Sequence, residues 1–194
     1  MEKIKINKIS AKAKKQKGFS EGPFAGCLNC PCGPDRTGGA CCKYGCDVDK
    51  ESFDLIYKNR DLIEPVIERK LEDCFDNEWM KGNYLGGSGV GSLVREEDGF
   101  CIFHKKGAKG CWLVDLVIRK GLPRRLIPTI CRIYPLTWTD EGELILVDDG
   151  GEDEIEPGCD CNSVENKTDK NILETQKEEL EDIFDIEVKY RGGN

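Results

Sequence analysis

Histidine is nearly absent from this sequence: a single residue, His104, is found among 194. General acid–base catalysis and cysteine–histidine nucleophilic catalysis draw heavily on histidine. Either mechanism would have to use this one residue, so we do not expect a cysteine-protease type of active site. No other acid–base constellation is visible in the sequence. The composition therefore favours a non-catalytic protein.

Long apolar runs are also missing, because lysines interrupt each short apolar group near the N-terminus. A secretory signal needs an apolar stretch of about 7 to 15 residues, and a membrane span needs about 18 or more. We therefore predict a cytoplasmic protein without a membrane partner. Thiols stay reduced in that compartment, so clustered cysteines favour metal binding or redox chemistry over permanent disulfides.

Positive charge is in short supply, with 29 lysines and arginines against 37 acidic residues and a net charge of -8. This balance disfavours a nucleic-acid partner, because phosphate binding draws mainly on basic side chains. The charge is unevenly spread. Seven lysines lie in residues 1–17, whereas acidic residues dominate 152–187. We predict that residues 1–20 form a solvated, flexible tail, with a docking arm for an acidic protein partner as the alternative.

Several familiar cofactor motifs do not occur. The sequence has no C-x-x-C-H for covalent haem and no C-x2-C-x2-C-x3-C-P of bacterial ferredoxins. A second C-x2-C that would complete a zinc ribbon is missing as well. The glycine-rich GGSGVG at 86–91 has neither the preceding strand nor the following helix of a nucleotide-binding loop.

Cysteine, in contrast, is abundant, with twelve residues, six of them in the stretch CLNCPCGPDRTGGACCKYGC at 27–46. Thiolate is a soft, anionic donor: four suit Zn²⁺, and three or four can hold an iron–sulfur cluster. The C-x2-C at Cys27 and Cys30 can bring two sulfurs to one centre. Adjacent side chains diverge, so the pair Cys41 and Cys42 is expected to reach two different partners. Candidate partners farther along the chain are Cys101, Cys111, Cys131 and Cys159.

These elements together resemble a known family. CLNC, GACC, CIF at 101–103, Cys111 and CRIYPL at 131–136 are similar to the signature of the YkgJ-type cysteine-rich proteins, described as zinc- or iron-chelating. The resemblance covers residues 27–140. It departs from the family pattern in the eight residues PCGPDRTG, which separate CLNC from GACC and bring the additional Cys32.

The resemblance implies a metal-binding protein that holds Zn²⁺ or a [4Fe-4S] cluster. It implies eight ligands: Cys27, Cys30, Cys41, Cys42, Cys101, Cys111, Cys131 and Cys159. Some proteins with a similar pattern look like protein-modifying methylases with an iron–sulfur cluster, so an iron–sulfur enzyme or electron-transfer protein is the alternative. No role is assigned to Cys32, Cys46 or Cys161, and His104 is either a ligand or a surface or core residue.

The periodicity between the cysteines predicts a small α+β domain with several helices and short β-hairpins. Residues 50–74 are expected to form two helices, the first capped by Asp49 and the second with Pro65 in its first turn. Cys74 at their end is expected to be buried rather than a ligand. Residues 82–91 are expected to be a flexible loop.

The second half of the chain has clear start and stop signals. A hairpin around residues 97–99 should deliver Cys101 and His104, and a helix should run from Cys111 to Gly121. A second hairpin is expected with its turn at residues 140–142. Apolar residues on one side of 166–188 predict an amphipathic helix docked on the domain, with partner binding as the alternative.

The chain divides into three predicted segments. They are a basic tail at 1–20, a cysteine-rich metal-binding domain at 21–162 with long loops organised around metal centres, and an acidic amphipathic helix and tail at 163–194. The sequence does not distinguish zinc from iron–sulfur, since both accept all-thiolate ligation.

Overall fold

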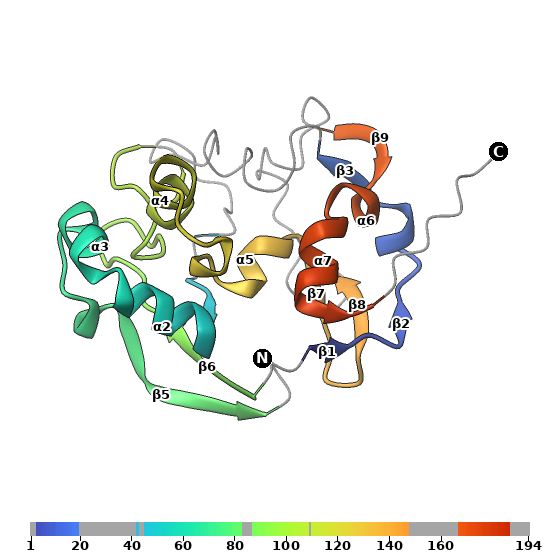
Figure 1. Ribbon diagram of the computed structural model, residues 1–194, viewed down its shortest axis with the longest axis horizontal. Helices are drawn as coiled ribbons and strands as arrows, with labels where there is room; N and C mark the ends of the chain where they lie inside the picture. Colours follow the sequence, from blue (N-terminus) through green and yellow to red (C-terminus); the bar gives the residue numbers. More distant parts are fainter. Residues whose placement is uncertain are drawn as a thin grey trace.

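The computed structural model describes residues 3–19, 42, 45–82, 87–108, 110–147 and 167–186. In these residues the chain is a small mixed α+β fold, as predicted (Figure 1). The helices are α2 (Lys50–Lys58), α3 (Arg60–Ile67), α4 (Trp112–Lys120), α5 (Thr129–Ile133), α6 (Ile172–Thr175) and α7 (Lys177–Ile183). Short 3-10 turns are η1 (Ala13–Lys15), η2 (Leu71–Asp73) and η4 (Arg124–Leu126).

The strands are short and form four small sheets. They are β1 (Ile4–Lys5), β2 (Lys8–Ile9), β3 (Lys17–Phe19), β4 (Asp47–Asp49), β5 (Phe75–Gly82), β6 (Gly87–Ser92), β7 (Leu136–Trp138), β8 (Glu143–Leu146), β9 (Lys167–Asn171) and β10 (Phe184–Asp185). The sheet orders are β1-β10, β2-β8-β7, β3-β9 and β4-β6-β5.

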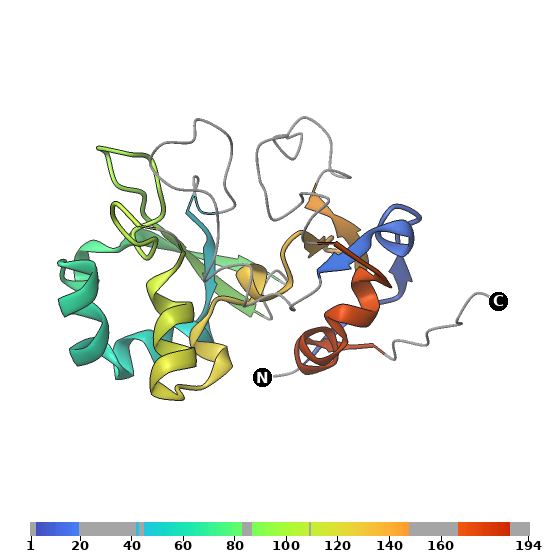
Figure 2. The same cartoon turned by 90° about the horizontal axis from the view of Figure 1, so that it is seen from above.

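Two hydrophobic cores form on either side of α5 (Figure 1). In the first, α2, α3 and α4 accompany the sheet of β4, β5 and β6. Its buried side chains include Val48, Ile56, Ile63, Leu71, Phe75, Val90, Phe103, Leu113 and Leu126. Burying an aliphatic or aromatic side chain of this size contributes about 1.5 to 3 kcal/mol. The second core lies between the N-terminal strands β1 and β2, the helices α6 and α7 and the hairpin of β7 and β8 (Figure 2).

The two helices predicted after residue 49 are present. Asp49 caps α2 by accepting a hydrogen bond from the backbone N–H of Ser52 at 2.9 Å. A second helix, α3, follows directly, and its apolar Ile63 is fully buried. Pro65 lies inside α3 rather than in its first turn, because the helix begins at Arg60.

The loop predicted for residues 82–91 was wrong for 87–91. These residues belong to β6, which pairs antiparallel with both β4 and β5. Gly91 lies so close to the carboxylate of Asp76 that a side chain there would collide with it. The glycines therefore suit this strand because it passes close to its neighbours.

The second hairpin and the helix predicted in the second half are confirmed. The turn at 97–99 is also present, but its two arms are joined by an isolated bridge between Val94 and Cys101 and do not form strands. Backbone hydrogen bonds join Arg95 N–H to the Phe100 carbonyl at 2.8 Å around the first turn. Helix α4 begins after Cys111 and ends at Gly121, whose φ of 66° is a left-handed conformation that favours glycine. Strands β7 and β8 pair antiparallel around the second turn.

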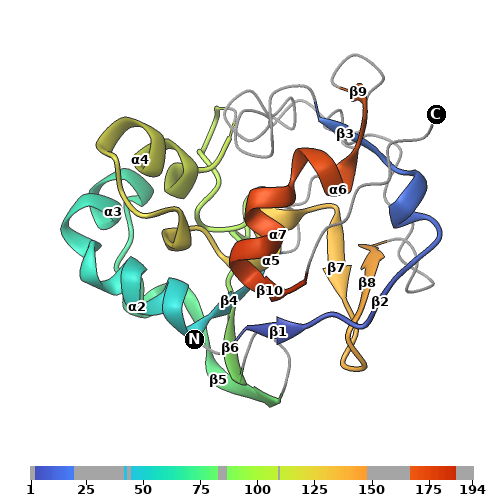
Figure 3. The ribbon, with the colours of Figure 1, turned by 45° about the vertical axis from the view of Figure 1, so that its right-hand side comes forward.

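Residues 3–19 do not form the solvated tail that we predicted. Strands β1 and β2 pair parallel with β10 and β8, and β3 pairs antiparallel with β9 (Figure 3). Ala13 is fully buried, and Ile4, Ile6 and Ile9 pack against the second core. The lysines between them remain exposed, so the segment is a set of edge strands with one apolar side.

The amphipathic C-terminal segment is docked on the domain, as predicted, but only its middle is helical, as α6 and α7. Lys167–Asn171 and Phe184–Asp185, which were also predicted to be helical, are the strands β9 and β10. The chain bends at Gln176, whose side-chain amide donates to the carbonyl of Tyr134 at 3.0 Å. The predicted apolar face is buried in the second core: Ile172, Leu173, Leu180, Ile183 and Phe184. Among the described helices, none is both long and apolar enough to cross a membrane.

Candidate metal centre

Half of the predicted ligand set can be placed in the structure. Four of these cysteines lie in described segments: Cys42, Cys101, Cys111 and Cys131. The other four lie outside the described residues: Cys27, Cys30, Cys41 and Cys159. Cys32 and Cys161, which the sequence left without a role, also lie outside them.

Cys46 links the described thiols, although the sequence pattern predicted no role for it. Its side chain lies close enough to those of Cys101 and Cys131 for both to affect its pKa. Cys46 precedes β4, Cys101 lies on the hairpin after β6, and Cys131 lies in α5. Thiols from three segments that are distant in sequence therefore become neighbours.

Asp49 connects the elements that carry two of these thiols. Its carboxylate accepts from the N–H of Ser52 at the start of α2 and from the N–H of Thr129 at the start of α5, at 2.9 and 3.0 Å. Since Asp49 ends β4, it fixes the helix that carries Cys131 to the strand that follows Cys46. Its carboxylate also accepts from the Ser52 hydroxyl at 2.8 Å, and Asp49 is 2% exposed.

Ser92 lies against both Cys46 and Cys101. Its Oγ is 3.5 Å from the Sγ of Cys46 and 3.4 Å from the Sγ of Cys101. The same Oγ accepts the backbone N–H of Cys46 at 2.9 Å, and the backbone N–H of Ser92 donates to the carbonyl of Cys46 at 2.8 Å. Ser92 is 7% exposed. The two thiols are thus held beside one buried hydroxyl.

The surroundings of these thiols favour their neutral form. For Cys46, a hydrogen bond with Cys101 lowers the pKa, but a hydrogen bond with Cys131 and burial raise it, and the pKa ends well above its usual value. For Cys101, the hydrogen bond with Cys46 and burial raise the pKa well above its usual value. Two neighbouring thiols cannot both ionise easily in an apolar environment without a cation between them.

Cys42 and Cys111 lie on segments that contact the hairpin bearing Cys101. The backbone N–H of Cys101 donates to the carbonyl of Cys42 at 2.5 Å. Cys111 forms an antiparallel bridge with His104 and precedes the first residue of α4. Both cysteines are partly buried and pack against the first core. All four described ligand cysteines therefore lie in the first core or pack against it.

Within the part of the chain that the structure describes, no group of three or more histidine, cysteine, aspartate or glutamate side chains is arranged so that it could hold a metal ion. The predicted ligand set thus stays a prediction. Neither Cys46 nor Ser92 was predicted from the sequence. The spacing Cys42-x3-Cys46 was the available signal for the first, and only the pairing of β4 with β6 reveals the second.

Two further residues behave as core residues. His104 is 2% exposed, and its ring stacks on that of Phe100 with a centroid distance of 4.5 Å. Cys74 is fully buried, as predicted, and its thiol donates to the carbonyl of Lys70 at 3.2 Å. Burial raises the pKa of Cys74 to about 12.

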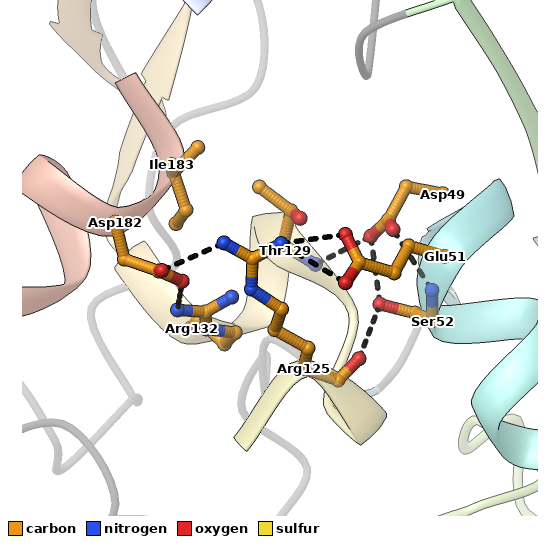
Figure 4. A pocket seen from close by; sticks show the side chains of 8 residues that line it. All are labelled: Asp49, Glu51, Ser52, Arg125, Thr129, Arg132, Asp182 and Ile183. Carbon is orange, nitrogen blue, oxygen red and sulfur yellow. Dashed lines mark hydrogen bonds and ion pairs between the residues drawn. The ribbon is translucent and has the colours of Figure 1, made fainter. Parts of the chain in front are cut away.

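A second polar cluster lies between the two cores and lines a small pocket (Figure 4). Arg125 donates to both carboxylate oxygens of Glu51, at 2.9 and 2.7 Å, and to Asp182 at 2.7 Å. Arg132 donates to Glu179 at 2.7 Å through Nε and to Asp182 at 2.5 Å through Nη2. Both arginines form ion pairs with carboxylates of the protein itself. The cluster therefore holds α2, α5 and α7 together and is not a binding site for an anionic ligand.

Comparisons with known proteins add no identification, since no family model, curated protein or solved structure matches the chain.

Proposed function

We propose that this protein binds a metal centre, zinc or an iron–sulfur cluster, through cysteine thiolates. One observation carries the proposal: the sulfurs of Cys46 and Cys101, from two distant segments, lie 3.5 and 3.4 Å from the same buried hydroxyl of Ser92, and Cys131 lies close enough to Cys46 to affect its pKa. Thiolates are the preferred ligands of zinc and iron–sulfur centres. The donor chemistry therefore fits either group.

The remaining ligands would come from the cysteines that the family resemblance implies. Cys42 and Cys111 lie on segments that contact the hairpin of Cys101. Cys27, Cys30, Cys41 and Cys159 complete the set that we propose, with Cys46 added to it. When bound, the metal supplies a positive charge that stabilises the deprotonated sulfurs.

In this proposal the protein controls the protonation of the thiols and positions the elements that carry them. Cys101 lowers the pKa of Cys46, but Cys131 and burial outweigh it, and at Cys101 the contact with Cys46 and burial raise the pKa. Both thiols are therefore neutral in the absence of a cation, so metal binding releases protons. Binding also joins β4, the hairpin at 93–104 and α5, which Asp49 already connects in part. The metal therefore contributes to the stability of the first core as well as occupying a site.

Elemental analysis of anaerobically purified protein, together with an absorption spectrum, tests the proposal. We expect on the order of one metal equivalent per chain or more; iron with broad visible absorption indicates a cluster, and colourless protein with zinc indicates a zinc site. The variant Cys101→Ser should lose much of this metal. The matched control is Cys74→Ser, which alters a buried cysteine outside the thiol group and should keep it. A wild-type protein with far less than one equivalent would contradict the proposal.

A further inference from the structure

Ser92 is bound to the Cys46 residue in three ways. Its backbone N–H donates to the Cys46 carbonyl, its Oγ accepts the Cys46 N–H, and its Oγ lies 3.5 Å from the Cys46 sulfur. Gly45 makes this approach possible, because a Cβ at that position would collide with the Ser92 carbonyl oxygen. The φ of Gly45 is also +76°, a value that side-chain-bearing residues rarely adopt. The position of the Ser92 hydroxyl is therefore fixed by backbone contacts.

The hydrogen bond that Ser92 Oγ accepts from the Cys46 N–H indicates that its hydroxyl donates to a sulfur. Since Oγ already accepts the N–H of Cys46 at 2.9 Å, its single hydrogen remains to be donated. Among the residues that the structure describes, the sulfurs of Cys101 and Cys46, at 3.4 and 3.5 Å, are acceptors within its reach. A metal-bound thiolate has no proton, so it can only accept. In a loaded centre, Ser92 has to be the donor.

We infer that Ser92 is a positioning residue of the proposed metal centre, donating its hydroxyl hydrogen bond to the sulfur of Cys101 or Cys46. This inference rests on the proposed function. A hydrogen bond to a ligating sulfur orients the ligand and removes part of its negative charge, and such outer contacts affect metal affinity about 10- to 100-fold. In an iron–sulfur centre the same bond affects the reduction potential.

The test compares Ser92→Ala with Ser92→Thr, which keeps the hydroxyl. Each protein is loaded with Zn²⁺, and the rate of metal release to a chromogenic chelator is measured. We expect Ser92→Ala to release zinc about 10-fold faster than the wild type, and Ser92→Thr to restore a rate near that of the wild type. Cobalt-loaded protein provides the second readout, since loss of the bond should shift the sulfur-to-cobalt charge-transfer band.

Thr175→Val is the matched control, because it also removes a side-chain hydroxyl, one that donates to the Ile172 carbonyl at 3.2 Å in α6 rather than to a cysteine. It should leave the charge-transfer band unchanged. If Ser92→Ala does not fold, NMR of the ¹¹³Cd-loaded wild type replaces it: a scalar coupling between cadmium and the Ser92 hydroxyl proton supports the inference, and its absence overturns it.

The outcomes separate the two proposals. A wild-type protein that takes up no metal overturns the proposed function and, with it, this inference. A wild-type protein that binds metal, with a release rate and a charge-transfer band that Ser92→Ala leaves unchanged, overturns the role of Ser92 alone.

Discussion

Replacing Arg132 by methionine removes the cation of a buried ion pair. The side chains of Arg132 and Glu179 are each only 4% exposed. Arg132 donates to Glu179 through Nε and Nη2 and also pairs with Asp182. After the substitution, Glu179 keeps Arg124, whose Nη1 lies 3.0 Å away but whose side chain is 56% exposed. The carboxylate thus remains buried with a weaker partner.

Removing one partner of a buried ion pair costs about 3 to 5 kcal/mol, mostly because the other charge is left uncompensated. The surviving contact with Arg124 places Arg132→Met at the lower end, at about 3 kcal/mol. With a urea m-value of about 2 kcal/mol/M, the unfolding midpoint should fall by about 1.5 M. Adding Glu179→Met removes the buried charge, so the double variant should lose only about 1 kcal/mol.

Urea unfolding followed by circular dichroism measures these differences. Lys177→Met is the control, on the helix that carries Glu179, because its ion pair with Glu181 spans 3.7 Å and is exposed. It should cost less than about 0.5 kcal/mol. The reasoning is refuted if Arg132→Met costs less than about 1 kcal/mol, or if the double variant is as unstable as the sum of its two single variants.

Three further predictions concern the first core. Cys74 is neutral when folded, with a pKa of about 12, but ionises near pH 9 when unfolded, so its contribution is complete below pH 9 and is lost as pH rises toward 12. Between pH 8 and pH 10 the stability advantage of reduced wild type over Cys74→Ala should therefore shrink by about 1.4 kcal/mol in urea titrations. Asp49→Ala should cost about 2 kcal/mol, because two buried backbone N–H groups lose their acceptor; an unchanged thermal midpoint would contradict this. Gly45→Ala should destabilise by at least about 1 to 2 kcal/mol from its left-handed conformation alone, and Gly99→Ala, with similar φ and open space around it, should cost less.

Elements with strong local signals were predictable from the sequence. Asp49 before an amphipathic stretch and Gly121 after one mark real helix ends. The turn at 140–142 likewise joins two paired strands. In these places the residues that decide the structure lie within a few positions of one another.

The remaining elements depend on partners far away in the chain. Ile4 and Ile6 alternate with lysines as a strand does, but β1 has only two residues, and its partner is β10. The high lysine count hid this pattern. Strand β6 was missed for the opposite reason, since its glycines have low strand propensity and are accommodated by close neighbours.

The type of ligand at the candidate site could be predicted from the sequence, but the cysteines that lie together could not. The abundance of cysteine pointed to sulfur ligation, and the structure places Cys101 and Cys131 beside a shared neighbour. That neighbour, Cys46, lies beside them only because β4, the hairpin and α5, which are distant in sequence, pack together. Periodicity carries no information on which of several cysteines such an arrangement selects.

The pairing of β1 with β10 has a consequence for how the chain is made. Ile4 pairs with Phe184, so the second core cannot close until residue 184 has left the ribosome. The first core uses only residues between 42 and 131, and its contacts become available earlier during synthesis. During synthesis, Cys46, Cys101 and Cys131 can therefore come together before β10 has emerged to pair with β1.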